Sequence, residues 1–341
     1  MPKVSIIMST YNDSQYIQQA VESILNQTYK DFEFIIIDDA STDDTIEIIK
    51  SYKDERIILI INSVNQGLTK NLNKALRVAS GEYIARMDGD DVSFPDRLEK
   101  QVNYLDKHRD VYLIGTAIRN IGASDLYWKL PDDSEDLRVR MLLHPVFAHP
   151  SFMFRKGIVD EGLCYDESFR TAQDYDFASR VARNHKIGRL QQVLLNYRVH
   201  DKQISNTSSK NQVDNAGRVR NRLLHELGIE LSDSQQRIYN DWVAERQLSN
   251  LDEYKRAYEL IDLICERNSH THIYDSQILS IVLRKLLYTW VIRSKNIRLV
   301  LCFPKLCKYK VANMTIFLGE VVRTINEKIE KRIMRNKVCN I

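Results

Sequence analysis

The sequence predicts an α/β fold, a mainly parallel sheet wrapped by helices, followed by an α-helical C-terminal extension. Up to about residue 199, β-rich apolar runs alternate with helix-like segments through short loops, the pattern typical of parallel sheets. Polar clusters follow three of these runs directly, at 10–12, 38–39 and 88–91. After a polar stretch at 205–215 the chain reads as helix almost throughout. These observations divide the chain into residues 1–208 and residues 209–341.

The first half of the sheet is predicted from four apolar runs and the helical spacing between them. Residues 32–37 are almost continuously apolar, which indicates a strand that is buried on both faces. Ile17, Val21 and Ile24 recur at helical spacing behind the first run. The predicted strands are 4–8, 32–37, 56–61 and 83–87, and the predicted helices are 14–26, 45–52 and 69–79.

The second half is less regular but continues the same alternation. Leu98, Val102 and Leu105 are spaced as on one face of a helix. The remaining predicted elements are helix 97–107, strand 112–115, strand 151–155, helix 174–182 and strand 193–199.

Composition limits the class of protein. With 341 residues, 43% of them apolar and 28% charged, the chain is long enough for a globular catalytic domain with an extension. The five cysteines are scattered and odd in number, which indicates reduced thiols rather than a disulfide framework. The first residues turn polar too early for a signal peptide, and no run of about 18 apolar residues occurs. We therefore expect a cytoplasmic protein.

The polar clusters at 10–12, 38–39 and 88–91 predict a common site. In open parallel sheets, ligands bind beyond the carboxyl ends of the strands. The first strand lacks the Gly-x-Gly-x-x-Gly pattern of dinucleotide-binding domains, and the chain lacks a P-loop. A glycine-rich cradle for phosphates is therefore not expected, and the aspartates must have another role.

Asp88-Gly89-Asp90 offers two carboxylates one residue apart, with a glycine that permits a sharp backbone path. Mg²⁺ and Mn²⁺ take such oxygen ligands and bridge to substrate phosphates. The alternative is a solvated turn held by side-chain hydrogen bonds. A calcium loop of the EF-hand type is not expected.

Four segments together resemble the family 2 glycosyltransferases of the GT-A fold, inverting enzymes of the kind that build bacterial surface polysaccharides. They are, in order, VSIIMSTYNDSQYIQQAVESILNQTY, FIIIDDASTDDT, NQGLTKNLNKAL and GEYIARMDGDDVSFPDRLEKQV. The resemblance spans roughly residues 3–205. It implies a UDP-sugar donor and a divalent cation, Mn²⁺ or Mg²⁺.

The resemblance also implies donor-binding residues. Asp39 would accept a hydrogen bond from the uracil imide, although Asp38 and Asp39 could instead cap the following helix. Lys70 would face the ribose or phosphates, although it could be an ordinary surface lysine. The donor-binding set that it implies is Thr10, Tyr11, Asn12, Asp39, Asn65, Lys70, Asp88 and Asp90.

For the metal, the resemblance implies Asp90 as the direct ligand and Asp88 as a contact to the ribose or to a metal-bound water. Asp91 would support the loop. His200 would approach the metal or the diphosphate, although a lone histidine is more often structural.

The segment TAQDYDF, residues 171–177, resembles the family's Glu-Asp-Tyr element with Gln173 in place of the glutamate. Asp174 is then the expected general base for the acceptor hydroxyl. Loss of the neighbouring charge would by itself lower the pKa of Asp174. Alternatively Asp174 caps a helix, and Tyr175 or Asp176 acts instead.

The C-terminal tail is basic. Residues 281–341 hold 14 Lys/Arg and 3 Asp/Glu, whereas the rest of the chain is acidic. An apolar stripe in 312–341 predicts a basic amphipathic helix suited to an anionic membrane surface. It could equally pack on the body or on a partner subunit. Nucleic acid is not expected, because no aromatic residues interleave the charges. The stripe comprises Leu318, Val322, Ile325, Ile329 and Ile333.

Together these features predict an inverting transferase at the inner face of the cell membrane. It would move a hexose or N-acetylhexosamine from a UDP-sugar to a hydroxyl of a lipid-linked saccharide. The alternative is a non-catalytic protein that binds nucleotide sugars or polysaccharides on the same fold.

Overall fold

The computed structural model describes residues 1–122, 132–200, 209–245, 248 and 250–293. Met1–Ser294 form one compact unit, and the second unit, Lys295–Ile341, lies outside the described residues, together with the helix predicted at 312–341. No helix of the described part is both long and apolar enough to cross a membrane. The division predicted between residues 208 and 209 stays a prediction.

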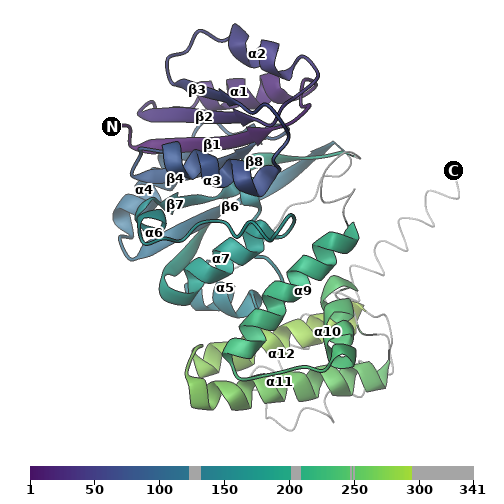
Figure 1. The fold of residues 1–341 in the computed structure, drawn as a ribbon. Helices are drawn as coiled ribbons and strands as arrows, with labels where there is room; N and C mark the ends of the chain where they lie inside the picture. Colours follow the sequence, from purple (N-terminus) through teal and green to yellow (C-terminus); the bar gives the residue numbers. More distant parts are fainter. Residues whose placement is uncertain (123–131, 201–208, 246–247, 249, 294–341) are drawn as a thin grey trace, which may run out of the picture. The chain divides into compact units, whose positions relative to one another are not determined.

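The first unit is built on an eight-stranded sheet with the strand order β3-β2-β1-β4-β7-β6-β8-β5 (Figure 1). The pairs β3–β2, β2–β1, β1–β4 and β6–β8 are parallel, and β7 and β5 pair antiparallel with their neighbours. The mainly parallel sheet is thereby confirmed. The strands are β1 (Val4–Thr10), β2 (Phe32–Asp38), β3 (Ile57–Ile61), β4 (Tyr83–Asp88), β5 (Val92–Ser93), β6 (Val111–Gly122), β7 (Met153–Arg155) and β8 (Lys186–Val199).

The helices follow the predicted order, and the described part of the C-terminal region, up to residue 293, is largely helical as expected. Among the described residues they are α1 (Ile17–Leu25), α2 (Thr45–Ser51), α3 (Leu68–Val78), α4 (Arg97–Lys107), α5 (Ser134–Arg140), α6 (Gly157–Asp160), α7 (Gln173–Asn184), α9 (Ser209–Glu226), α10 (Asp233–Glu245), α11 (Leu251–Thr271) and α12 (Ser276–Arg293), with a 3₁₀ turn η1 at His149–Ser151.

The core explains why β1, β2 and β4 read as apolar runs. Alternate residues such as Ile6, Phe34 and Ala85 pack with Val21 of α1 and Leu98 of α4. Residues of the opposite parity face the other side of the sheet, where α3 contacts β1 and β2. These central strands are covered on both faces, and the clusters 10–12, 38–39 and 88–91 lie at their carboxyl ends.

Strand β8 is twice as long as the predicted segment 193–199, running over Lys186–Val199 beside β6. Its first half carries Gly188, Gln191 and Gln192, and the two glutamines are exposed. A strand that is only partly buried does not form an apolar run, so periodicity found only its second half.

Candidate active site

The predicted meeting of the strand ends is confirmed by the register of the sheet. Thr10 at the end of β1 lies opposite Asp38 at the end of β2, and Ser9 lies opposite Asp88 at the end of β4. The clusters 10–12, 38–39 and 88–91 therefore emerge from one edge of the sheet.

The loops after β1 and β2 lock together. Asn12 adopts a left-handed backbone conformation (φ 54°), which asparagine tolerates better than most residues. Its backbone N–H donates to Ser41 Oγ at 2.9 Å, and its side-chain oxygen accepts from the Thr42 N–H at 2.8 Å. Asn12 thus holds the loop in shape, whereas the Tyr11 ring is 48% exposed and open to stacking.

Asp39 organises the loop after β3. Its Oδ1 accepts from the Gln66 N–H and from Asn62 Nδ2, and its Oδ2 accepts from the Gly67 N–H at 2.8 Å. Burial by itself would raise the pKa of Asp39, but these hydrogen bonds outweigh it and hold the pKa below its ordinary value. Its predicted contact to uracil stays a prediction, and Oδ2 retains acceptor capacity for it.

We expect Asp39→Ala to lower the free energy of unfolding by about 1–3 kcal/mol, because the Gln66 and Gly67 N–H groups lose their acceptor. Since the folded-state pKa is lowered, this stability is present at neutral pH and is lost as pH falls through that lowered pKa. Urea unfolding at pH 7 measures it. Asp44→Ala, at an exposed carboxylate that makes no side-chain capping bond, is the control and should change stability by less than about 0.5 kcal/mol. Equal effects of the two changes would contradict the role given to Asp39.

The sequence interpretation missed a buried amide pair beneath Asp39. Asn62 Nδ2 donates to both Asp39 Oδ1 and Asn71 Oδ1, and Asn71 Nδ2 donates to Ser9 Oγ. Asn71 is fully buried on the sheet-facing side of α3. A polar residue at a buried helix position was the signal that could have revealed this pair. Asn65 and Lys70 are exposed at the same loop and helix start, and their predicted donor contacts stay predictions.

The acidic loop after β4 brings three carboxylates together. One ligand oxygen from each of Asp88, Asp90 and Asp91 lies within 4.8 Å of the others. Asp91 is fully buried, and its Oδ2 has no hydrogen-bond partner. Burial raises the pKa of Asp88, with Arg86 opposing the rise, and burial together with Asp90 and Asp88 raises the pKa of Asp91 well above its usual value.

This donor set fits a hard divalent cation. Clustered carboxylate oxygens, one of them buried without a partner, are the ligands that Mg²⁺ and Mn²⁺ prefer. Two fully buried arginines lie close enough to oppose part of the negative charge: Arg86 donates to Asp88, and Arg97 donates to the Arg86 carbonyl at 2.6 Å.

The end of β8 is fastened onto this loop. Arg198 donates from its backbone N–H to Asp91 Oδ1 at 2.8 Å and from Nε to the Asp90 carbonyl at 2.7 Å. His200 Nε2 lies 2.9 Å from Asp90 Oδ2. The structure therefore brings His200 to Asp90, and direct ligation of a metal by His200 stays a prediction.

Asp13 is a further residue that the sequence interpretation missed. Its Oδ2 accepts from Thr10 Oγ1 at 2.7 Å, and a β-carbon at Gly89 would lie 2.6 Å from that oxygen. Burial raises the pKa of Asp13 to about 6, with the Thr10 hydrogen bond opposing and Asp90 adding to the rise. The glycine at position 89 is thus required for close approach of a fourth carboxylate.

Asp174 lies in the first turn of α7, just after Ala172, whose backbone is left-handed (φ 57°). Burial raises the pKa of Asp174 to about 6, backbone N–H groups oppose the rise, and the charge of Asp88 adds to it. The sequence predicted that Gln173, which carries no charge, would by itself leave the pKa of Asp174 lower than a glutamate would; the rise above the ordinary value comes from burial.

The two alternative candidates for the general base, Tyr175 and Asp176, are buried and engaged in other interactions. Tyr175 is buried and its hydroxyl donates to the Met141 carbonyl. Asp176 is fully buried and is paired with Arg180 and Arg222. Of the three candidates, Asp174 alone retains partial exposure.

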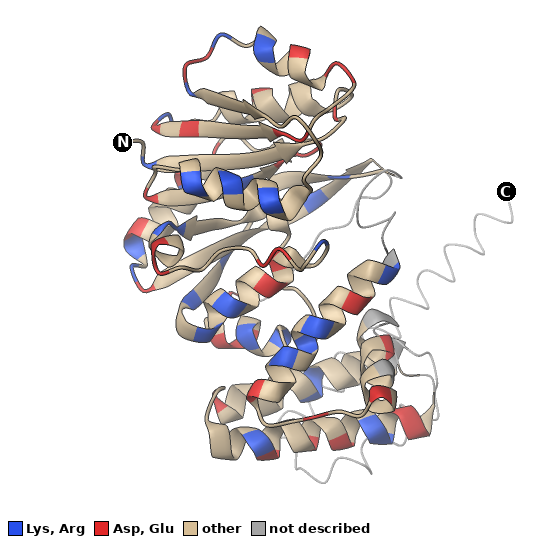
Figure 2. Ribbon diagram, viewed as in Figure 1, with Lys and Arg blue, Asp and Glu red and all other residues tan. Residues whose placement is uncertain are grey.

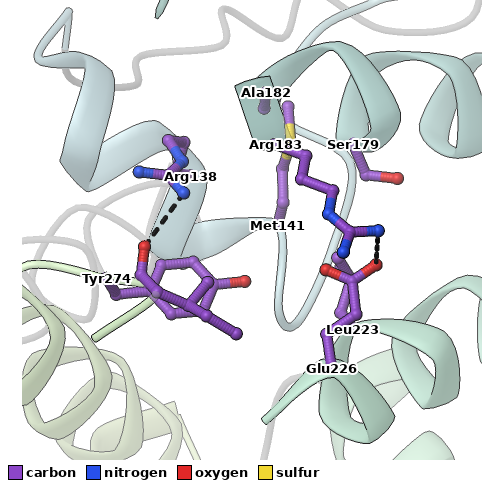
Figure 3. A pocket seen from close by; sticks show the side chains of 9 residues that line it. Arg138, Met141, Ser179, Ala182, Arg183, Leu223, Glu226 and Tyr274 are labelled. Atoms are coloured by element: carbon purple, nitrogen blue, oxygen red, sulfur yellow. Dashed lines mark hydrogen bonds and ion pairs between the residues drawn. The ribbon is translucent and has the colours of Figure 1, made fainter. Parts of the chain in front are cut away.

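A cavity lies away from these residues, between α5, α7, α9 and the turn before α12 (Figure 3). Its volume of about 20 Å³ holds one water molecule at most. It is therefore too small to be a ligand site.

The site thus combines the acidic, cation-fitting loop at one edge of a mixed sheet with Asp174, a carboxyl whose pKa is raised. Comparison with known proteins specifies the class: residues 5–163 match the model of glycosyl transferase family 2. An uncharacterised glycosyltransferase of Methanocaldococcus jannaschii, MJ1057, is 39% identical over 207 residues, which cover 58% of this chain and 71% of that protein. The O-antigen biosynthesis glycosyltransferase WbnJ of Escherichia coli is 36% identical over 209 residues, covering 58% and 80%.

The chain belongs to glycosyl transferase family 2. Among solved structures, residues 1–349 of S. aureus TarS in complex with UDP-GlcNAc share the fold with a TM-score of 0.56 at 18% identity, over 87% of this chain and 91% of that one. The expected GT-A fold is thereby confirmed.

Proposed function

We propose that this chain is an inverting glycosyltransferase that moves a hexose or an N-acetylhexosamine from a UDP-sugar to a hydroxyl of a lipid-linked saccharide. The observation that carries the proposal is the pairing of a cation-fitting acidic loop with Asp174, whose raised pKa of about 6 suits a general base. The UDP-GlcNAc bound by TarS supports the donor class, and the O-antigen role in the name of WbnJ supports the acceptor class.

In the proposed reaction, Asp174 accepts the proton of the acceptor hydroxyl as its oxygen forms the bond to the anomeric carbon. The bond between that carbon and the diphosphate breaks on the opposite face, and UDP leaves with the electron pair. Configuration inverts in one displacement, so no covalent enzyme intermediate is needed. A divalent cation held by Asp90, with Asp88 and Asp91, would neutralise charge on the departing diphosphate.

On the donor side, we propose that the exposed Tyr11 ring stacks on the uracil and that Asp39 accepts its imide N–H. Asn65 and Lys70 would reach the ribose and phosphates from the loop and helix start that Asp39 organises. We also propose that the basic segment 312–341 holds the enzyme at the inner face of the cell membrane, where a lipid-linked acceptor resides.

Thermal-shift measurements with UDP-glucose, UDP-galactose and UDP-GlcNAc, with and without Mn²⁺, test the donor proposal. A donor that binds only the folded state raises the unfolding temperature, and we expect one UDP-sugar to do so chiefly with Mn²⁺. GDP-mannose is the control. A shift with GDP-mannose and none with any UDP-sugar would contradict the proposed donor. Stable binding with no UDP release in a mixed acceptor pool would favour a binding protein instead.

A further inference from the structure

One face of α9 carries four residues that contact the segment presenting Asp174. Asn211, Asn215, Arg218 and Arg222 recur at intervals of four, three and four residues, so they share one side of the helix. We call these four residues the α9 polar face. Figure 2 marks Lys and Arg positions along the ribbon of α9 in blue, and two residues of this face, Arg218 and Arg222, are arginines.

Two contacts precede Asp174 in sequence. The buried Thr171 hydroxyl donates to the Asn211 carbonyl at 3.1 Å and accepts from Asn215 Nδ2 at 2.9 Å. The Thr171 hydroxyl therefore both donates a hydrogen bond to α9 and accepts one from it.

Arg218 contacts the same loop at Ser168, three residues before Thr171. Its Nη2 donates to Ser168 Oγ at 3.0 Å, and its guanidinium lies 4.1 Å from the centre of the Phe169 ring. Arg218 Nη1 also donates to Asn215 Oδ1 at 3.1 Å. Arg218 and Asn215 therefore act as one polar unit against the loop.

A third contact follows Asp174. Arg222 donates to the fully buried Asp176 and, through Nη2, to Ser179 Oγ at 2.6 Å. The α9 polar face therefore contacts the chain on both sides of Asp174, at 168–171 and at 176–179.

From the sheet side, the loop is held by α3. Thr69 Oγ1 donates to the Phe169 carbonyl at 2.7 Å, and Asn73 Nδ2 donates to the Tyr165 carbonyl at 2.9 Å. The loop thus lies between α3 and α9 just before the left-handed Ala172 that begins α7. With α9 loosened, the loop would keep its α3 contacts but lose its support on the other side.

We propose that the α9 polar face positions Asp174 for proton transfer, which makes α9 a working part of the active site. The inference rests on the proposed function, in which Asp174 is the base. General-base catalysis requires hydrogen-bond distance to the acceptor hydroxyl, and displacement of a reacting group by about 1 Å can cost about 100-fold in rate. The residues of this face position the base without contacting substrate.

The test uses the full chain, Mn²⁺ and whichever of UDP-glucose, UDP-galactose or UDP-GlcNAc supports UDP release. We expect Asn215→Ala and Arg218→Ala each to lower kcat several-fold, and the double variant to lower it at least about tenfold, with donor KM changed less than about twofold. Assays are run well below each variant's measured unfolding temperature, so that loss of folded protein does not contribute.

Arg183→Ala is the matched control. Arg183 Nη1 donates to Glu226 at 3.4 Å, joining the same two helices beyond the base (Figure 3). Its kcat should stay at the wild-type value. An equal fall in Arg183→Ala would overturn the inference, because it would show general loosening of the helices. Wild-type kcat in the Asn215→Ala, Arg218→Ala double variant would overturn it as well.

Arg222 provides a second test of the inference. Arg222→Met leaves Asp176 with Arg180 but without Arg222 as a cationic partner, which can unfold the protein, so a variant that keeps the charge is compared with it. Arg222→Lys keeps the charge and should recover kcat relative to Arg222→Met. If Asp174→Asn retains transfer, the proposed base has failed. If Asp174→Asn abolishes transfer while the α9 variants behave as wild type, the role of α9 alone has failed.

Discussion

Asp174→Asn is expected to lower kcat by about 10²–10⁴-fold, the usual contribution of a general base, while UDP-sugar binding is retained. Asparagine preserves the size and the hydrogen bonds of the side chain but cannot take the acceptor proton. In the wild-type enzyme, kcat/KM should rise with pH and level off above about 6, the pKa to which burial raises Asp174. Steady-state kinetics over pH 5–8 and a separate binding titration give the two quantities.

The same substitution should preserve stability. Folding raises the pKa of Asp174 above its unfolded value, so stability from this carboxyl is present at low pH and is lost as pH rises through about 6. Above that pH the ionised group disfavours the folded state, and asparagine removes that cost. The unfolding temperature at pH 7.5 should therefore stay the same or rise. Normal transfer by Asp174→Asn, or loss of donor binding, would contradict the assignment.

Asp90→Asn is expected to lower kcat/KM by about 10² or more and to weaken Mn²⁺ binding, since the cation stabilises leaving-group charge by several kcal/mol. Mn²⁺ affinity is measured by electron paramagnetic resonance of the free ion, which does not depend on turnover. The control is Asp110→Asn, an exposed carboxylate paired with Lys186 before β6. Unchanged Mn²⁺ affinity in Asp90→Asn would show that the cation is held elsewhere.

The central sheet could be predicted from sequence because its strands are buried on both faces. The apolar runs of β1, β2 and β4 locate the strands, and parallel strands must end at one edge, which placed Thr10, Asp38 and Asp88 together. The first half of β8 was not predicted, because its exposed glutamines break the apolar pattern, whereas the predicted second half carries Arg198, which donates to the Asp90 carbonyl.

Of the carboxylates of the site, Asp39, Asp88, Asp90, Asp91 and Asp174 could be predicted, but Asp13 and the hydrogen-bond partners could not. Asp13 and Asn71 lie in ordinary polar stretches, and only the folded arrangement places them against Gly89 and Asn62. Likewise, only packing distinguishes the role of Asp174 from that of Asp176, because the sequence places both aspartates in one turn of the same helix. Burial is set by contacts between distant segments, and the pKa of Asp174 followed burial rather than its neighbour in sequence.

The buried arginines under the acidic loop have a consequence for how this site can change by mutation. Arg86 and Arg97 are fully buried and lie with Asp88 and Asp91 in one electrostatic network. Neutralising one aspartate leaves an arginine less compensated inside the sheet, and neutralising one arginine leaves aspartates that repel one another more strongly. Substitutions in this network should therefore be strongly non-additive. Loss of the cation site in evolution would therefore require replacement of acidic and basic members of the network. Replacing them one at a time would pass through poorly folded single variants.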